Sequence, residues 1–421
     1  MTERTQSKIK FVGLHAHSVA GSIFDALGFP QEHMDFAYQN GMDALALTDH
    51  GNQNGLAYQV LHAKKMKAEG KDFKPIFGCE AYFIPSVDEW KEEYDQTMLD
   101  KKKARAAKKA GASGATVEDE GASKGKGNSV LRRRRHLVLL VQNQKGLNNL
   151  FKLVSESYKD ENFYRYPRMD YKMLKEHGEG IIASSACLGG VYAGNYWENR
   201  DESPEAVLDA MRETTRRMVD VFGDRWHGEI QWNNVPEQHE LNKFVIQVCE
   251  EFGVKVISTA DSHYPNRDAW KDRELYKRLG WLGKGKPQWA DTESDLPISV
   301  DEIGYELYPK NGDEMWESYK NYSQMCKTNY DDDLVLNSIE ETHRIAFDRI
   351  ENFLPDNTVR LPSFVVPAGN TATGALIKFS IEGLNKLGFA DNKIYLERLK
   401  HELNVIDDRG FSKYFLTMKA I

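Results

Sequence analysis

Residues 13–18, with the sequence GLHAHS, decide the fold of this chain. They end an apolar run that begins at Phe11, and this run predicts a short buried strand. Residues two apart on a strand point to the same side, so His15 and His17 project together. Neutral imidazole is a common metal ligand, and two on one strand face form half of a metal site. Because paired histidines also occur as ordinary core or surface residues, the interpretation depends on what the other strands carry.

Apolar runs and helical patterns alternate through about the first 265 residues. Helical stretches at 30–39 and 56–68 separate the first three runs, a pattern that indicates a parallel sheet. No glycine-rich phosphate loop follows the first strand, and polar residues gather toward the C-terminal ends of the strands, as in a (β/α) barrel. We therefore predict an α/β barrel with fewer than eight strands. The expected strands lie at 11–18, 43–47, 74–84, 136–141, 180–187, 226–232 and 255–263.

A lysine- and glycine-rich insertion, at about 95–133, interrupts this pattern. Residues 101–135 hold twelve Lys or Arg and three Asp or Glu. The simpler interpretation is a solvated, flexible loop. The alternative is a basic tether that follows a phosphate backbone, best represented by the arginines just before the fourth strand. The candidate nucleic-acid contacts are Arg132, Arg133, Arg134, Arg135 and, farther along, Arg168.

Bulk properties limit the compartment and the class of partner. The formal net charge of −8 argues against a generic nucleic-acid binder, so any such surface is local. The four cysteines form no CxxC pair, which fits free thiols in a reducing compartment. The first residues lack the apolar core of a signal peptide, and no apolar run is long enough to span a bilayer. We expect a cytoplasmic protein with no membrane partner.

The region from about residue 270 onward is mostly helical and less regularly patterned. Helices are expected at 332–351 and 395–408. At 421 residues the chain is too long for one ordinary core, so two domains are expected. We place them at 8–268 and 269–421.

Nine residues with metal-binding side chains lie at or near the ends of the expected strands. Singly, each has a simpler explanation: His50 could cap the following helix, and Cys187 could be an inert core thiol. Jointly they need a positive charge, because burying so many polar groups at one end of a barrel is otherwise costly. They are too many for one ion and suit a cluster of two or three. The candidate ligands are His15, His17, Asp25, His50, Glu80, His136, Cys187, Asp261 and His263.

The donor types also indicate which ions such a cluster would hold. A histidine-rich set favours Zn²⁺ or Mn²⁺ over Mg²⁺ or Ca²⁺, which prefer oxygen ligands. Such clusters bridge the attacking and leaving oxygens of a phosphodiester and lower the pKa of bound water to about 7. We expect no catalytic residue separate from the ligands and no organic-cofactor site.

These motifs resemble the PHP (polymerase and histidinol phosphatase) domain. The matching motifs, in order, are HAHS at 15–18, TDHG at 48–51, GCE at 78–80, HLVLL at 136–140, the strand that ends at Cys187 and ADSH at 260–263. The flanks are similar to the N-terminal part of bacterial and phage DNA polymerase III alpha subunits. They are FYRYPRMDYKML at 163–174, IIASSACLGG at 181–190 and YLERLKHELNVIDDRGFSKYFL at 395–416.

The resemblance implies a distorted (β/α)7 barrel that binds up to three metal ions, linked in some alpha subunits to 3′-to-5′ exonuclease proofreading. All nine ligand positions hold competent residues, which implies an active domain. The segment from His17 to Asp25 is one residue longer than the family pattern, so Asp25 is the least certain ligand. The implied sets are His15, His17, Glu80 and Asp261 for one ion; Glu80, His136 and Cys187 for a second; and Asp25, His50 and His263 for a third.

The resemblance also implies that residues 269–421 are the N-terminal, incomplete part of a polymerase palm region. No paired aspartates in a matching context occur there, so the chain as given is not expected to polymerise DNA. Its expected partners are a DNA 3′ end, the remaining palm and fingers on another chain or a missing segment, and other replisome subunits. The compartment would be the cytoplasm of a bacterium or a phage-infected host.

Three functions remain open. The first is a metal-dependent phosphoesterase or 3′-to-5′ exonuclease that forms part of a replicative polymerase. The second is a non-catalytic PHP module that supports the palm of a split or truncated polymerase and binds a proofreading partner. The third, a free-standing phosphatase, leaves the region after residue 269 unexplained.

Overall fold

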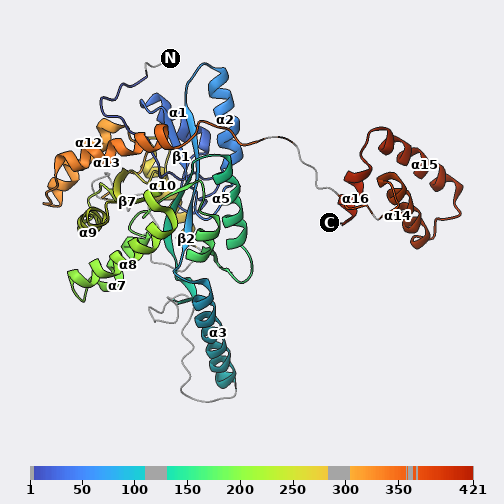
Figure 1. Ribbon diagram of the computed structural model, residues 1–421, viewed down its shortest axis with the longest axis horizontal. Helices are drawn as coiled ribbons and strands as arrows, with labels where there is room; N and C mark the ends of the chain where they lie inside the picture. Colours follow the sequence, from blue (N-terminus) through green and yellow to red (C-terminus); the bar gives the residue numbers. More distant parts are fainter. Residues whose placement is uncertain are drawn as a thin grey trace. The chain divides into compact units, whose positions relative to one another are not determined.

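The computed structural model describes residues 4–109, 130–282, 304–356, 358, 364–366 and 368–420. The chain forms two compact units, Met1–Pro355 and Asp356–Ile421. The first unit has a sheet at its centre with helices around it (Figure 1). The second unit is helical. The expected α/β class is therefore confirmed.

The sheet of the first unit curls into most of a barrel. Its strands pair in the order β4-β5-β2-β3-β6-β7-β8, and β1 pairs with β2. Strands β4 and β5 form a hairpin attached to the end of β2. The bounds are β1 Ala44–Leu47, β2 Lys74–Phe83, β3 Arg135–Val141, β4 Phe163–Tyr164, β5 Tyr166–Met169, β6 Ile181–Ser184, β7 Trp226–Gln231 and β8 Lys255–Thr259.

Residues 11–18 close the barrel between β1 and the end of β8. On one side, Ala46 donates its backbone N–H to the carbonyl of Gly13 at 2.8 Å. On the other side, His17 donates to the carbonyl of Ser262 at 2.7 Å, and Ser262 donates to that of His15 at 3.1 Å. The expected first strand is thus an extended segment with isolated bridges on both sides. With β1, β2, β3, β6, β7 and β8 it completes a distorted seven-stranded barrel.

The sheet is mixed, which corrects the expectation of a parallel sheet. Strand β3 runs antiparallel to both of its neighbours, β2 and β6, whereas β1–β2, β6–β7 and β7–β8 are parallel. The long segment after β2 returns the chain to the end of the barrel where β2 finishes, so β3 must run back the other way. As a result, His136 near the start of β3 lies at the same end as the C-termini of the parallel strands.

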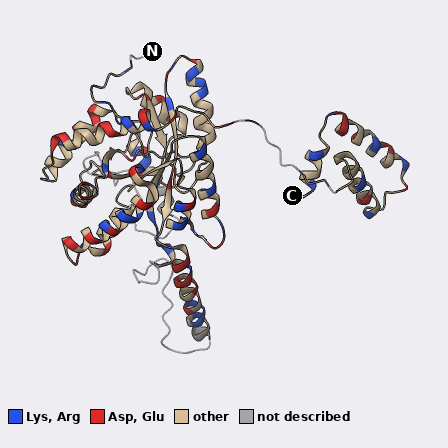
Figure 2. Ribbon diagram, in the orientation of Figure 1, with Lys and Arg blue, Asp and Glu red and all other residues tan. Residues whose placement is uncertain are grey.

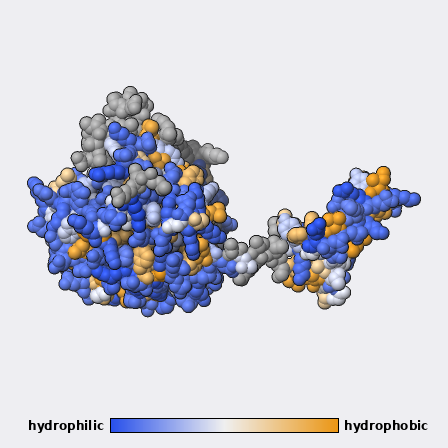
Figure 3. All heavy atoms as spheres, turned by 90° about the horizontal axis from the view of Figure 1, so that it is seen from above, coloured by the Kyte–Doolittle hydropathy of each residue, from blue (hydrophilic) through white to orange (hydrophobic). Residues whose placement is uncertain are grey.

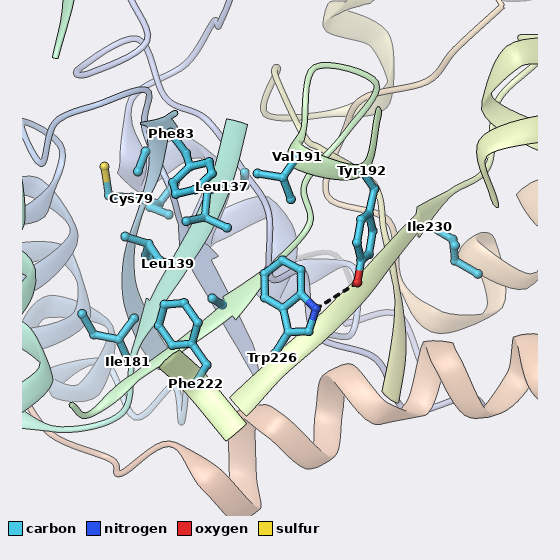
Figure 4. Close-up of a cluster of buried hydrophobic side chains, with 14 of the residues drawn as sticks. Cys79, Phe83, Leu137, Leu139, Ile181, Val191, Tyr192, Phe222, Trp226 and Ile230 are labelled. Carbon is cyan, nitrogen blue, oxygen red and sulfur yellow. Dashed lines mark hydrogen bonds between the residues drawn. The ribbon is translucent and has the colours of Figure 1, made fainter. Parts of the chain in front are cut away.

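Helices cover the barrel and bury a continuous apolar core. Helix α8 shows how the sequence sets their limits: Ser203 caps it by accepting a hydrogen bond from the N–H of Ala206 at 3.1 Å, and Gly223 ends it at φ 58°. Figure 4 shows Trp226 in the core, with its Nε1 donating to the hydroxyl of Tyr192 at 3.0 Å. The covering helices include α1 Pro30–Gln39, α2 Leu56–Ala68, α5 Gln144–Ser157, α6 Tyr171–His177, α7 Val191–Asn199, α8 Pro204–Phe222 and α9 Pro236–Phe252. No helix in the described ranges is long and apolar enough to cross a membrane.

Helices beyond residue 268 also belong to the first unit. They are α10 Trp270–Leu282, α12 Gly312–Met325 and α13 Asp332–Arg344, and α13 continues into a π-helical turn at Ile345–Arg349. Helix α13 packs on β8, where Ser258 Oγ lies 2.7 Å from Ser338 Oγ. Thr342 Oγ1 accepts the backbone N–H of Val12 at 3.1 Å. The compact unit that holds these contacts extends to Pro355, and the division into domains at 8–268 and 269–421 stays a prediction.

The insertion is partly helical. Helix α3, Val87–Lys109, includes the first part of the stretch we expected to be a loop, and residues 110–129 lie outside the described part of the chain. In Figure 2 the acidic residues of α3 gather near the barrel and the basic ones toward its far end. Trp90, buried at the base of α3, packs with Ile84 and Val87 and so anchors the helix. The expectation of a loop from about residue 95 is corrected: the lysine- and alanine-rich stretch is a good helix former.

The second unit contains three helices among its described residues: α14 Ala372–Lys386, α15 Lys393–Asp408 and α16 Ser412–Ala420. Its buried apolar residues are few, namely Ala375, Leu376 and Leu416. Many larger apolar side chains remain exposed, and Figure 3 shows hydrophobic patches on its surface. The assignment of residues 269–421 to a polymerase palm stays a prediction.

We predict that α13 stabilises the barrel itself. Ile339 of α13 is fully buried in the main core, so Ile339→Ala should lower the free energy of unfolding by about 2–5 kcal/mol. The matched control is Leu61→Ala on α2, where the side chain is 66% exposed and the change should be below about 0.5 kcal/mol. Chemical denaturation of both variants measures this, and equal stabilities would contradict an integral α13.

Candidate metal centre

All nine sequence-predicted ligands meet at one end of the barrel. His15 and His17 lie on the closing segment, and Glu80 lies inside β2. Each of the others lies on a loop or at the start or end of a strand. The elements of the barrel itself therefore position all nine side chains. Those others are Asp25, His50, His136, Cys187, Asp261 and His263.

Glu80 is the hub of the site. Its carboxylate is fully buried, and its Oε2 lies 2.6 Å from His50 Nδ1 and 3.5 Å from His17 Nε2. Its Oε1 lies 2.9 Å from His136 Nδ1 and 3.4 Å from His15 Nε2. One carboxylate therefore reaches four imidazoles, the arrangement needed for a ligand that bridges two ions.

Asp261 completes the first expected ligand set. Its Oδ1 lies 3.3 Å from His15 Nε2 and 3.2 Å from His17 Nε2. The backbone of Asp261 has φ 48°, a left-handed conformation that costs a non-glycine residue about 1–3 kcal/mol. Strain of this kind persists where the surrounding structure holds a functional side chain in place.

The third expected set also comes together. Asp25 Oδ2 lies 3.2 Å from His50 Nε2 and 3.9 Å from His263 Nε2. The ring of His17 stacks on His50 at a centroid distance of 4.2 Å, and it lies 4.4 Å from the ring of His263. Asp25, the least certain ligand by sequence, is thus within reach of both partners, although its side chain is 39% exposed.

Cys187 stands near the second set. Its Sγ lies 3.7 Å from His136 Nδ1 and 4.0 Å from Glu80 Oε1, and it accepts the backbone N–H of Gly189 at 3.4 Å. The four cysteines of the chain are free thiols in the structure. The antiparallel direction of β3 is what brings His136 to this thiol.

Unpartnered buried atoms indicate that this donor set fits metal ions. A buried polar atom without a hydrogen bond is costly, and several occur here on atoms that face one another. Three groups of side chains offer donor atoms within 4.8 Å of one another. Five atoms of the site are buried without a hydrogen bond although they face ion-pair partners at 2.6–3.5 Å: His15 Nε2, His17 Nε2, His50 Nδ1, Glu80 Oε2 and Asp261 Oδ1.

Glu229 is a functional residue that the sequence analysis missed. This buried carboxylate on β7 accepts a hydrogen bond from His15 Nδ1 at 2.7 Å, and also bonds Thr259 Oγ1 at 2.6 Å and Ser184 Oγ at 2.6 Å. A proton held on Nδ1 leaves the Nε2 of His15 free as a ligand. The available signal was a lone acidic residue in the otherwise apolar or neutral run 226–232.

Asp49 orients His17 in a similar way through Ser22. The Asp49 carboxylate accepts hydrogen bonds from Ser22 Oγ at 2.9 Å and from the backbone N–H of Ser18 at 2.7 Å. Ser22 Oγ in turn lies 3.2 Å from His17 Nδ1, so its lone pair can take that proton. The signal here was Asp49 in the motif TDHG, next to His50.

Electrostatics show that protons occupy this site when metal is absent. Burial lowers the pKa of His50, but the charge of Glu80 and a hydrogen bond to Asp25 raise it to about 10. Burial also lowers the pKa of His15, but the carboxylates around this imidazole raise it well above 6.5. Burial opposes ionisation of Glu80, yet the histidines around it keep its pKa well below the usual value. Protonated histidines therefore balance the carboxylates where cations would otherwise do so.

The expected nucleic-acid contact at Arg168 is corrected by the structure. Its side chain is fully buried and donates to the carbonyls of Leu131 at 2.8 Å and Tyr166 at 2.9 Å. Its guanidinium also lies 4.1 Å from the ring centroid of Trp90. Arg168 ties the base of α3 to the hairpin, because a buried guanidinium needs acceptors for its several donors.

Comparison with known proteins identifies the family. The model of the PHP domain matches residues 13–233, and the chain belongs to this family. It is 32% identical to the DNA polymerase III subunit alpha of Aquifex aeolicus over 97% of this chain and 31% of the relative. It is 29% identical to that of Borreliella burgdorferi over 97% of this chain and 30% of the relative. The resemblance to the N-terminal part of these subunits is thus confirmed, and the chain spans about a third of their length.

Among solved structures, an amidohydrolase from Chromobacterium violaceum aligns with a TM-score of 0.30 and 16% identity. The alignment covers 63% of this chain and 96% of that one. A similarity of this degree carries no weight here.

We predict that Glu229 sets metal affinity without binding metal. Glu229→Gln keeps the size of the side chain but removes the charge that holds the proton on His15 Nδ1. Apparent metal affinity should fall by about 10- to 100-fold, as for other groups that orient a ligand. Competition with a chromophoric chelator measures the affinity. The control, Glu179→Gln at an exposed site, should bind metal like the unchanged protein, and unchanged affinity in Glu229→Gln would contradict the role.

We predict opposite pH trends for metal-free stability and metal affinity. The pKa of His50 rises from 6.5 to about 10 on folding, so protonated His50 stabilises the metal-free fold. That contribution is complete below 6.5 and is lost as pH rises toward 10. Metal must displace these protons, so its affinity should rise by up to about tenfold per pH unit for each proton released.

Thermal unfolding at pH 6.5 to 9.5, with chelator or with added Mn²⁺, measures both trends. The melting temperature should fall with pH in chelator, and the gain from metal should grow. A gain from metal that stays constant over this range would contradict the displacement of protons.

Proposed function

We propose that this chain is the PHP portion of a replicative DNA polymerase III alpha subunit and that it hydrolyses phosphodiester bonds at DNA 3′ ends. The observation that carries the proposal is the meeting of nine metal-competent side chains at one end of the barrel, where several buried donor atoms face one another without a hydrogen bond. The family match and the polymerase relatives support the DNA substrate. The chain covers about a third of the length of those relatives, so its place within a whole polymerase is part of what we propose.

The first two proposed ligand sets share Glu80 as a bridge. Two or three divalent ions, Zn²⁺ or Mn²⁺ rather than Mg²⁺, suit this histidine-rich set. When bound, such ions polarise the phosphodiester and supply a hydroxide near neutral pH. The proposed sets are His15, His17, Glu80 and Asp261; Glu80, His136 and Cys187; and Asp25, His50 and His263.

The remaining residues of the site hold the ligands in position. Glu229 and Asp49 fix the ring orientation of His15 and His17, as described above. Five of the nine side chains are buried, whereas Asp25, His50, His136 and Cys187 are partly exposed. These four mark the side from which a DNA end would reach the centre.

The region 269–421 is proposed as the start of the polymerase palm. On this proposal, its partners are the remaining polymerase segments and other replisome subunits, and the protein acts in the cytoplasm of a bacterium or a phage-infected host. A non-catalytic PHP module that supports the palm is the alternative, and the experiment below separates the two.

We predict metal-dependent removal of nucleotides from the 3′ end of single-stranded DNA. An oligonucleotide labelled at its 5′ end should shorten stepwise with Mn²⁺ or Zn²⁺ present. The double variant His15→Ala, Asp261→Ala should lose more than about 100-fold in rate, because both residues belong to the same proposed ion site.

The control is His177→Ala, a histidine of α6 outside the nine ligands, which should cleave at the unchanged rate. If the metal-loaded chain and the double variant are equally inert, the non-catalytic module is the correct reading. Hydrolysis of a small phosphomonoester alone would instead indicate a phosphatase.

A further inference from the structure

Arg134 lies beside the candidate metal centre. It comes just before β3, which begins at Arg135, and its guanidinium lies near the ring of Tyr82. His136 is paired in register with Tyr82 on the neighbouring strand β2. Tyr82 in turn stands two residues after Glu80, the hub of the site. Arg134 is thus placed next to the centre by its contact with Tyr82.

Two tyrosine rings hold the Arg134 side chain. The guanidinium carbon lies 4.0 Å from the ring centroid of Tyr166 and 5.5 Å from that of Tyr82. The two rings meet edge to face at 5.1 Å. Tyr82 also lies nearly parallel to the ring of His50, at 12° and 6.1 Å. One aromatic ring therefore separates the guanidinium from a proposed metal ligand.

The neighbouring arginines have carboxylate partners, and Arg134 does not. Arg133 pairs with Glu93 at 3.1 Å, and Arg135 pairs with Glu198. Across the described part of the chain, no carboxylate lies within ion-pair distance of Arg134, and its Nε is buried without a hydrogen-bond partner. A planar guanidinium is suited to bind a phosphate through two parallel hydrogen bonds.

We propose that Arg134 binds a phosphate group of the DNA strand beside the phosphodiester at the metal centre. The guanidinium donates to the non-bridging oxygens, and the ring of Tyr166 keeps it in place by a cation–π contact. No carboxylate has to be displaced from it first. This inference rests on the proposed function for its substrate, but binding can be tested without catalysis.

The test measures binding of a fluorescent single-stranded oligothymidylate of about ten nucleotides, a length within the usual site size of about 4–16. Arg134→Ala should weaken binding by about 10- to 100-fold, as expected for a charged hydrogen bond. The slope of log affinity against log salt should become smaller by about 0.7, the value for one phosphate contact. Anisotropy titrations at several salt concentrations give both quantities.

Matched variants separate phosphate binding from a structural role. Arg216→Ala removes an exposed arginine of α8 that pairs with Glu213 at 2.8 Å, and should leave affinity and salt slope unchanged. Arg134→Lys keeps the charge, so it should keep the salt slope while losing part of the affinity. Metal content and thermal unfolding of each variant confirm that the fold and the centre are intact. If Arg134→Ala does not fold, Arg134→Lys and Tyr166→Leu carry the test, and both should weaken binding.

The outcomes distinguish this inference from the proposed function. Weaker binding in Arg134→Ala supports the inference even if no DNA is cleaved. Normal affinity and salt slope in Arg134→Ala overturn it even if the chain is an active nuclease. Competition by inorganic phosphate identifies the source of the ligand: Arg134-dependent binding of phosphate without any binding of the oligonucleotide overturns the DNA source. If neither probe binds, the inference is also overturned.

Discussion

The buried carboxylate of Glu80 is the constraint on which the site depends. An ionised carboxylate inside a protein is costly unless cations or donors surround it, and effective penalties reach several kcal/mol per charge. In this barrel four imidazoles approach Glu80 within 3.5 Å. Without metal, protons on His15 and His50 supply the positive charge. On the proposed function, divalent ions replace those protons. The free-energy cost of bringing the candidate ligands together is then borne by folding and not by metal binding.

The topology brings these ligands together in a way that a uniform parallel barrel would not. Strand β3 runs against its neighbours, so its first residues rather than its last ones reach the ligand end. That reversal places His136 opposite Tyr82 and near Cys187. Segment 11–18 bridges β1 and the end of β8 and thereby joins the first and last parts of the barrel. The candidate ligands come from this segment and from the elements on both sides of it. Metal binding would therefore depend on the integrity of the whole barrel.

Arginines near this centre have distinct roles that depend on their partners. Arg168 is buried against backbone carbonyls and Trp90, where it supports the hairpin and the base of α3. Arg133 and Arg135 are neutralised by carboxylates. Arg134 keeps its charge available next to Tyr82 and Tyr166. Four of the five candidate arginines thus divide into structural, paired and available side chains, and only the last kind suits a phosphate backbone.

The sequence by itself determined the local features of this protein. Apolar runs and caps located all seven barrel segments and helices such as α8, because periodicity and capping are local properties. The nine candidate ligands could be named because metal-binding side chains are distinctive and stand at or near strand ends. The tertiary structure alone decided the direction of β3, the roles of Glu229 and Asp49, and the burial of Arg168. These depend on which residues meet across the barrel, and contacts between distant segments leave no periodic signal in the chain.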